Sequence, residues 1–254
     1  MKDWVLITGA STGIGYELAK LFAADGYNLA LVARNEKKLK EVASELESKH
    51  KVSTRVMAID LSRPESPENL FEALRDTPIS VLVNNAGFGS MGPFAEADLS
   101  KDVAMMQVNM RALVQLTHLF LAPMLKRKAG YVLNVASTAA FQPGPYMAMY
   151  YATKAFVFSF SVALAEELAG TGVSVTTFCP GPTQTEFQER AQIRRPLGPL
   201  PSMSAEAAAR DGYRGMLRGK RIVIPGAVNK ISSAIARRLP AVFVSKMVRR
   251  INGR

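Results

Sequence analysis

The chain has few of the residues from which disulfides and metal sites are built. Its 254 residues contain one cysteine, Cys179, and two histidines, His50 and His118. A single cysteine excludes an intramolecular disulfide, and without a Cys/His cluster we predict no metal site. This cysteine usage indicates a reducing compartment, so the sequence predicts a cytoplasmic protein.

Long apolar runs are also missing. Near the amino terminus, Val5–Ile7 is the apolar stretch before the first glycine, too short for the core of a secretory signal. The longest candidate elsewhere, 155–165, is interrupted by Ser159 and Ser161 and falls short of the roughly 18 apolar residues of a membrane-spanning helix. We therefore predict neither export nor a membrane-spanning segment.

Acidic residues are absent after Asp211. Eleven of the 32 Lys and Arg residues lie in 212–254, which leaves 21 basic residues against 21 acidic ones in 1–211. The net charge of +11 therefore belongs to one end of the chain. Such a distribution predicts a local surface that faces an anionic partner, and it argues against a nucleic-acid-binding protein.

Short apolar segments alternate with amphipathic helical patterns along most of the chain. Strands are expected at 5–7, 28–33, 55–59, 81–83, 131–135, 173–178 and 221–224. Helices are expected at 16–25, 36–49, 67–75, 101–126 and 150–169. Strands that are apolar throughout and followed by helices predict a parallel sheet covered on both faces.

The predicted fold class is therefore α/β, a doubly wound parallel sheet of the Rossmann type. We predict a single cofactor-binding and catalytic domain over 1–228, followed by a basic amphipathic extension over 229–254. Within the domain, the irregular segment at about 186–203 is rich in Pro and Arg. A loop of that length in a compact domain is typical of a lid or binding loop, so we expect it to contact substrate.

Glycines directly after the first expected strand are spaced G-x-x-x-G-x-G. Glycine lets the backbone turn sharply and approach a pyrophosphate, while the amino terminus of the next helix presents free N–H groups to it. A tight strand–helix connection without a ligand is the alternative. On the cofactor interpretation, the predicted contacts of this turn are Gly9, Ser11, Thr12, Gly13, Ile14 and Gly15.

The second expected strand ends in Ala33-Arg34-Asn35. An NAD-binding fold usually places an Asp or Glu here on the ribose 2′-hydroxyl, whereas a guanidinium pairs with a 2′-phosphate. The sequence therefore predicts NADP(H) in preference to NAD(H), with Arg34 on the phosphate. A solvated arginine at the start of a helix is the alternative.

With these features on one chain, the sequence resembles the short-chain dehydrogenase/reductase family over about 5–185. Asp60-Leu61 resembles the family's adenine-contacting pair, Asn84-Asn85-Ala86-Gly87 its N-N-A-G segment, and Pro180-Gly181 with Thr185 the segment that holds the nicotinamide carboxamide. The resemblance also implies a homo-oligomer formed through the long helices after Lys101 and Tyr150. The further cofactor residues that it implies are Asp60, Leu61, Asn85, Ala86, Gly87, Tyr150, Lys154, Pro180, Gly181, Thr183 and Thr185.

The resemblance also matches Asn109, Ser137, Tyr150 and Lys154 to the family's catalytic tetrad. Independently of it, Tyr150 and Lys154 are four residues apart in a helical pattern and share one face. An ammonium beside a phenol is expected to lower the phenol's pKa from about 10. We expect Tyr150 to exchange a proton with the substrate oxygen and Ser137 to hold that oxygen. By resemblance, Asn109 steadies a water that relays protons from Lys154.

Each catalytic candidate has an ordinary structural alternative. Ser137 could be a strand-end hydroxyl, Tyr150 one of seven scattered tyrosines, and Lys154 an exposed helix position. Tyr151 competes for the role of Tyr150, but it lies only three residues before Lys154 and does not satisfy Y-x-x-x-K. We therefore expect Tyr151 to pack elsewhere on the helix.

Substrate preference is expected to come from the segment before Tyr150 and from the loop after Thr185. An apolar wall is predicted from Phe141, Pro143, Pro145, Met147 and Met149. In the loop, Arg190, Arg194 and Arg195 could clamp an anionic group or lie in solvent.

The tail from Asn229 onward is expected to form two short amphipathic helices broken at Pro240. Phe243, Met247 and Ile251 recur every fourth residue, and Lys246, Arg249 and Arg250 lie on other faces of the same helix. Such a helix docks on its own protein or a subunit partner, or it lies on a membrane surface as a basic interfacial helix.

The sequence thus predicts an NADPH-dependent oxidoreductase that moves a hydride between the nicotinamide and an apolar small-molecule substrate, a carbonyl compound or secondary alcohol. The alternative from another class is a nonenzymatic NADPH-binding sensor or scaffold whose basic tail binds a membrane or partner. The complete tetrad favours the enzyme.

Overall fold

The computed structural model describes residues 3–187, 191 and 202–253, and a parallel sheet forms its centre. Within these residues seven strands pair in the order β3-β2-β1-β4-β5-β6-β9, all parallel. Their bounds are β1 Trp4–Thr8, β2 Asn28–Ala33, β3 Thr54–Ala58, β4 Ile79–Asn84, β5 Gly130–Val135, β6 Val173–Phe178 and β9 Ile222–Val223. The predicted Rossmann-type fold in a single domain is confirmed.

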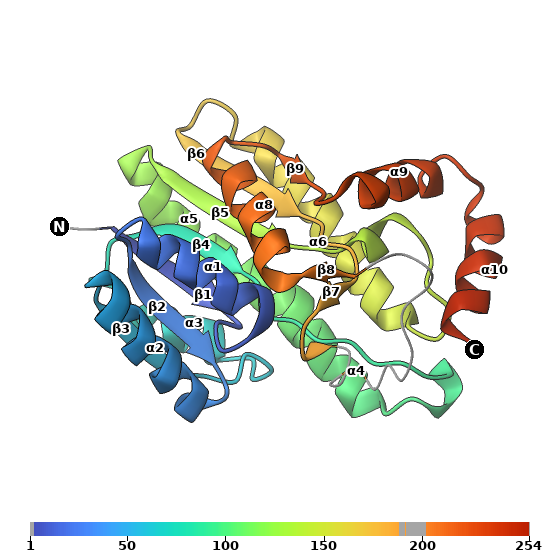
Figure 1. Ribbon diagram of the computed structural model, residues 1–254, viewed down its shortest axis with the longest axis horizontal. Coiled ribbons are helices and arrows are strands. Elements are labelled where there is room, and N and C mark those ends of the chain that lie inside the picture. Colours follow the sequence, from blue (N-terminus) through green and yellow to red (C-terminus); the bar gives the residue numbers. More distant parts are fainter. Residues whose placement is uncertain (1–2, 188–190, 192–201, 254) are drawn as a thin grey trace.

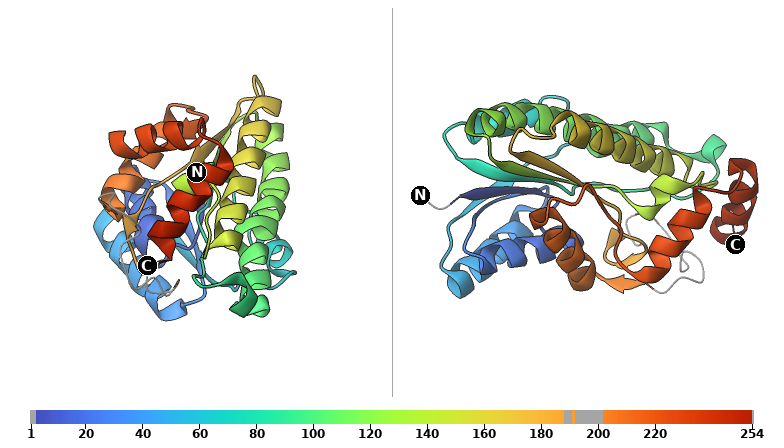
Figure 2. Two further views of the ribbon diagram at one scale, coloured as in Figure 1. Left: turned by 90° about the vertical axis from the view of Figure 1, so that its right-hand side faces the viewer. Right: turned by 90° about the horizontal axis from the view of Figure 1, so that it is seen from above.

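Helices cover both faces of the sheet (Figures 1 and 2). One face carries α1 (Gly13–Ala24), α2 (Glu36–His50) and α8 (Ala205–Leu217), whose Phe22, Leu46 and Tyr213 share one apolar core. The other face carries α3 (Ser66–Ala73), α5 (Leu113–Arg127) and α6 (Ala148–Glu167). Leu70 of α3 and Phe120 of α5 belong to a second apolar core on this face. The sheet is therefore buried from both sides, as its continuous apolar strands require.

The expected long helix at 101–126 is three elements. It begins as α4 (Leu99–Met106), continues through a π-helical turn (Gln107–Ala112) and ends as α5. A π turn inserts an extra residue into the helix, and it is common at functional sites. The insertion leaves the predicted catalytic Asn109 inside the turn.

Among the described residues, α6 is long and apolar enough to cross a membrane by length and composition alone. Its polar contacts place it on the sheet instead. Ser161 Oγ accepts from Asn134 Nδ2 at 2.9 Å, and Asn134 in turn accepts from Asn84 at 2.9 Å. These three buried side chains join α6 to β5 and β4, so α6 is a helix of the Rossmann fold.

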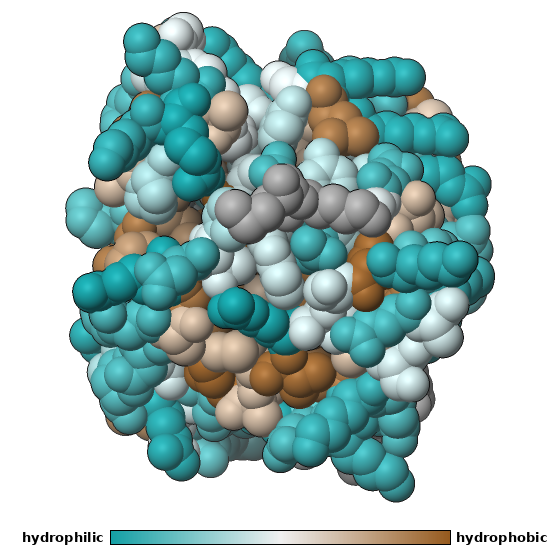
Figure 3. Space-filling model, turned by 90° about the vertical axis from the view of Figure 1, so that its left-hand side faces the viewer, coloured by the Kyte–Doolittle hydropathy of each residue, from teal (hydrophilic) through white to brown (hydrophobic). Residues whose placement is uncertain are grey.

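The tail forms α9 (Ala227–Ala236) and α10 (Ala241–Asn252) beside the carboxyl ends of the strands (Figure 2). Helix α10 docks through Val244 and Val248, which share a core with Met147 and Tyr151. The apolar line that the sequence pattern identified, Phe243, Met247 and Ile251, is exposed. The helix docks through the adjacent line of Val244 and Val248. At the opposite end of the molecule, around the amino ends of the strands, the surface is mainly hydrophilic with smaller apolar areas (Figure 3).

Candidate active site

A pocket of about 780 Å³ lies at the carboxyl ends of the central strands. In open parallel sheets ligands bind at this edge, where the strand order reverses. Two predicted site residues, Gly15 and Asn109, are not in its wall. The predicted residues that do line it are Gly9, Ser11, Thr12, Gly13, Ile14, Arg34, Asp60, Leu61, Asn85, Ala86, Gly87, Ser137, Tyr150, Lys154, Pro180, Gly181, Thr183 and Thr185.

The turn between β1 and α1 needs its glycines. Gly9 and Gly13 adopt φ values of +67° and +59°, which disfavour other residues. A Cβ on Gly15 would lie 2.2 Å from the Gly9 carbonyl oxygen, so Gly15 supports the turn from behind. Thr12 caps α1 without a side-chain hydrogen bond, so the first N–H groups of the helix have no side-chain acceptor there. This geometry fits a bound pyrophosphate.

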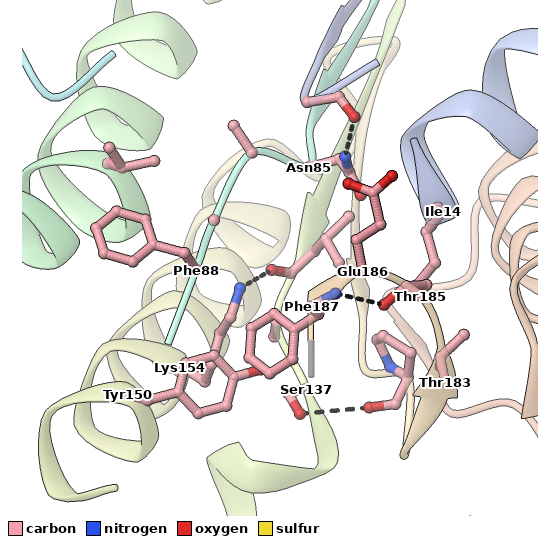
Figure 4. A pocket seen from close by; sticks show the side chains of 18 of the residues that line it. Ile14, Asn85, Phe88, Ser137, Tyr150, Lys154, Thr183, Thr185, Glu186 and Phe187 are labelled. Carbon is pink, nitrogen blue, oxygen red and sulfur yellow. Dashed lines mark hydrogen bonds between the residues drawn. The ribbon is translucent and has the colours of Figure 1, made fainter. Parts of the chain in front are cut away.

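The N-N-A-G segment holds the glycine turn in place. Asn85 Nδ2 donates to the carbonyls of Thr8 at 2.9 Å and Gly9 at 3.1 Å (Figure 4). The backbone N–H groups of Asn85 and Ala86 both donate to Thr8 Oγ1 at 3.0 Å. Asn85 therefore ties β4 to the β1 turn as well as lining the pocket.

The end of the pocket where the sequence predicts adenine carries Arg34 and Asp60. Burial raises the pKa of Asp60, but hydrogen bonds from Ser62 and the charges of Arg34 and Arg63 bring that pKa below its ordinary value. Asn35 caps α2 by accepting from Lys38 N at 3.0 Å. The end of β2 thus presents a guanidinium, with no carboxylate in the positions where NAD-binding folds place one.

Ser137, Tyr150 and Lys154 meet at the other end of the pocket (Figure 4). Ser137 follows β5, and its hydroxyl accepts from Ala139 N at 3.1 Å. Lys154 Nζ donates to the Val135 carbonyl at 2.8 Å and lies 5.9 Å from the centre of the Tyr150 ring. A hydroxyl, a phenol and an ammonium thus converge from two elements.

The protonation of this group differs from the expectation. Burial raises the pKa of Tyr150 to about 12, although a hydrogen bond with Ser137 opposes the rise. Burial lowers the pKa of Lys154 to about 8. The phenol's pKa therefore lies above its ordinary value and not below it as expected, because burial dominates and Phe187 covers the phenol at a ring-centre distance of 5.1 Å.

Comparison with known proteins assigns the family. Residues 3–195 match the family model described as short chain dehydrogenase. This chain belongs to the short-chain dehydrogenase family. Solved proteins similar to this chain include a short-chain dehydrogenase in complex with NADPH and a ketone-specific alcohol dehydrogenase.

Similar proteins of this family include a very-long-chain 3-oxoacyl-CoA reductase of Meyerozyma guilliermondii, 41% identical over 68% of this chain and 54% of its own. The chain thus spans about half the length of the fungal relatives that it matches. A solved short-chain dehydrogenase from Sphingobium yanoikuyae in complex with NADPH is 30% identical with a TM-score of 0.84, over 94% of this chain and 96% of its own. A solved 7β-hydroxysteroid dehydrogenase is 27% identical, with a TM-score of 0.88, over 97% and 96% of the two chains.

In this short-chain dehydrogenase Asn109 lies behind the pocket. Its Oδ1 accepts from Phe88 N at 3.1 Å, and its Nδ2 donates to the Phe88 carbonyl at 3.0 Å and to Thr153 Oγ1 at 3.1 Å. A Cβ on Gly87 would lie 3.0 Å from Asn109 Oδ1. Asn109 therefore joins Phe88, directly after the N-N-A-G segment, to α6, and its role at a relay water stays a prediction.

Tyr151 lines the same pocket, with its ring centre 6.1 Å from that of Tyr150, so the expectation that it packs elsewhere on the helix is wrong. Its ring covers Gly144, where a Cβ would lie 2.2 Å away, and it shares a core with Val244 and Val248 of α10. Burial raises its pKa, and hydrogen bonds with Asn252 and Gln142 oppose the rise.

The substrate end of the pocket differs most from the sequence prediction. Of the five apolar residues expected there, only Met147 lines the pocket; Phe141 packs against Phe158 instead. Arg190, Arg194 and Arg195 lie outside the described residues. The wall residues that the sequence missed include Phe88, Val108, Gln142, Phe187, Ile251 and Asn252.

Glu186 and Phe187 close one side of the pocket. Lys38 Nζ contacts Glu186 Oε1 at 2.7 Å, which ties the segment after β7 (Thr183–Gln184) to α2. Phe187 N donates to Thr185 Oγ1 at 3.3 Å, and its ring lies across Tyr150 (Figure 4). The sequence signal for the contact between Phe187 and Tyr150 was an aromatic residue two positions after Thr185, the last residue of the predicted nicotinamide segment.

Proposed function

We propose that the chain is an NADPH-preferring reductase of apolar carbonyl compounds. The observation that carries this proposal is the pocket itself, which has Arg34 at one end and Ser137 with Tyr150 at the other. When bound, NADPH supplies the hydride. The remaining chemistry is a proton for the carbonyl oxygen and a donor that stabilises its developing negative charge.

Tyr150 supplies the proton in this proposal. With a pKa of about 12 the phenol is protonated near neutrality, as an acid in reduction has to be. Ser137 Oγ lies beside it and donates to the same oxygen. Lys154, held by the Val135 carbonyl, keeps a positive charge behind the phenol and favours loss of its proton.

The preference for an apolar substrate rests on the wall at the substrate end. Val108, Met147, Phe187 and Ile251 line it, with Gln142 and Asn252 as polar groups. The names of similar proteins refer to molecules with a large apolar part, namely very-long-chain 3-oxoacyl-CoA and 7β-hydroxysteroids. A flexible methionine in an apolar wall accommodates substrates of this kind.

The test is NADPH oxidation with a panel of aromatic, steroidal, acyl-thioester and quinone carbonyls, with the Tyr150→Phe variant as the blank. Oxidation that depends on Tyr150 supports the reductase and narrows its substrate. No oxidation across the panel, with NADPH still bound, contradicts it and favours the NADPH-binding sensor.

We expect carbonyl reduction to decline as the pH rises through about 8, where Lys154 loses its proton in the folded protein. Below that pH the charged ammonium favours loss of the proton from Tyr150. Above it the charge is lost and so is this effect. The measurement is kcat/KM for reduction against pH, with circular dichroism at each pH as the control for folding. A profile that stays level well above this pH contradicts the prediction.

We also propose that the enzyme is a cytoplasmic homo-oligomer. Helices α4 and α6 lie in contact and expose Leu99, Val103 and Phe156, with exposed fractions of 69%, 55% and 41%. An apolar surface of this kind on adjacent helices is typical of a subunit interface. The buried free thiol of Cys179 agrees with a reducing compartment.

Light scattering tests the oligomer. The wild-type protein is expected at the mass of a dimer or tetramer, and Val103→Asp with Phe156→Asp at the mass of a monomer, because burying two carboxylates is costly. Ile231→Asp, at a similarly exposed apolar residue of α9, is the matched control and keeps the wild-type mass. A monomeric wild type contradicts the proposal.

A further inference from the structure

Helix α10 carries two apolar stripes side by side. Val244 and Val248 face the protein and are 5% and 4% exposed. Phe243, Met247 and Ile251 follow the adjacent line of the helix and are 54%, 48% and 40% exposed. Residues four apart lie on one line of a helix, so each set forms a continuous stripe. The stripe of Phe243, Met247 and Ile251 remains in solvent although the stripe of Val244 and Val248 is docked.

Basic side chains border this stripe. Lys246, Arg249 and Arg250 are exposed on the remaining side of α10, and no acidic residue follows Asp211 in the chain. Helix α9 lies at the same end of the molecule (Figures 1 and 2). Its Val228, Ile231 and Ile235 form a further exposed apolar line. We call this surface the basic apolar face; its residues are Val228, Lys230, Ile231, Ile235, Arg238, Phe243, Lys246, Met247, Arg249, Arg250 and Ile251.

The charge of the face selects its partner. A second copy bound through the same face would bring Lys246, Arg249 and Arg250 against their own equivalents, and like charges oppose that contact. An anionic lipid surface attracts the same side chains, while the exposed apolar stripe enters the boundary between headgroups and acyl chains. The combination of apolar stripe and basic border therefore fits a membrane better than a symmetric dimer.

The stripe ends at the pocket. Ile251 belongs both to the exposed stripe and to the pocket wall, and its neighbour Asn252 also lines the pocket. Asn252 Nδ2 donates to the Pro145 carbonyl at 2.9 Å, which fixes this end of α10 beside the catalytic helix. From Phe243 to Ile251 the stripe extends roughly 12 Å along the helix axis. The exposed apolar stripe thus continues into the substrate end of the pocket.

We propose that the basic apolar face docks the protein on an anionic membrane and that the pocket takes its carbonyl substrate from that membrane past Ile251. The delivery step rests on the proposed reductase function, whereas the docking step does not. The substrate class is then an amphiphilic or lipid-like ketone, whose apolar part lies among the lipids until the carbonyl reaches Ser137 and Tyr150.

Docking is tested by sedimenting the full chain with vesicles of phosphatidylcholine, with and without phosphatidylglycerol. The wild type is expected to bind the anionic vesicles and to be released by salt. Lys246→Glu with Arg250→Glu is expected to weaken that binding at least about tenfold. Lys49→Glu with Lys51→Glu makes the same charge change at the end of α2, outside the face, and is expected to retain far more of the binding.

Failure of the wild type to bind anionic vesicles overturns the proposal, and so does equal loss of binding in both charge variants. A second test replaces Phe243 and Met247 with serine, which leaves the docked stripe of α10 intact. This variant is expected to keep its thermal unfolding temperature and to lose vesicle binding. A fall in its mass by light scattering, without loss of vesicle binding, identifies the face as a contact between copies and overturns membrane docking.

Delivery is tested by turnover of a long-chain ketone carried in anionic vesicles and of a short water-soluble ketone. The wild type is expected to show a lower KM for the long-chain ketone than Lys246→Glu with Arg250→Glu, while both turn over the soluble ketone equally. Equal KM values for the long-chain ketone overturn delivery. Vesicle binding without turnover of either ketone contradicts the proposed function and leaves docking supported, so the two failures are distinguishable.

Discussion

Replacing Tyr150 with phenylalanine is expected to lower kcat by roughly 10²–10⁴-fold, the range that a lost general acid usually costs. The ring stays and keeps its contact with Phe187, so the shape of the pocket is retained. The proton donor beside Ser137 is lost. NADPH binding, measured by fluorescence titration, is expected to remain near the wild-type affinity.

Tyr151→Phe is the matched control, because it removes the same atom one residue further along α6. The Tyr151 ring packs on Gly144 and its hydroxyl faces Asn252 and Gln142. Its activity is therefore expected to stay within a few-fold of wild type, with the larger effect on stability. Near-normal turnover in Tyr150→Phe would assign the proton to another group, and Tyr151 would be the first to test.

Arg34→Asp is expected to raise the KM for NADPH by roughly 10- to 100-fold, the loss that follows when a charge-assisted hydrogen bond to phosphate is removed. The new carboxylate also repels the 2′-phosphate. In NADH it can accept from the ribose 2′-hydroxyl, so kcat/KM for NADH is expected to rise. The ratio of the two kcat/KM values measures the change in preference.

Lys40→Asp makes a change of the same size in charge on the outer face of α2, where Lys40 pairs with Glu36. Its cofactor preference is expected to remain that of the wild type. An Arg34→Asp variant that still prefers NADPH to the wild-type extent would place the phosphate elsewhere and would leave Arg34 as a partner of Asp60.

The fold was predictable because its signals are local. Continuous apolar strands separated by helical periodicity indicate a buried parallel sheet, and all seven expected strands overlap strands of the structure within a few residues of their bounds. Helix α8 was missed. Its inward face includes Ala208, Ala209, Gly212 and Gly215, small residues that give a weak hydrophobic signal although they pack closely against the sheet.

The cofactor end was also accessible from the sequence, because its chemistry is carried by short motifs. Gly9 and Gly13 adopt the positive φ values for which glycine is needed, and Lys154 follows Tyr150 by one helical turn. The pKa values of Tyr150 and Lys154 could not be predicted from the sequence. The pKa of Tyr150 depends on how completely the neighbouring segments exclude water from the phenol, and Phe187, far along the chain, supplies part of that cover.

The sequence by itself determined the fold class, the glycine turn, the guanidinium at the end of β2, the Tyr150–Lys154 pair and the basic tail, because each depends on residue type and short spacing. Tertiary structure decided which stripe of α10 is buried, that Asn109 lies behind the pocket, and that Ile251 joins Met147 in its wall. Periodicity shows that a helix has an apolar face. It does not show what that face meets, because packing between distant segments depends on the complementary shape of both surfaces.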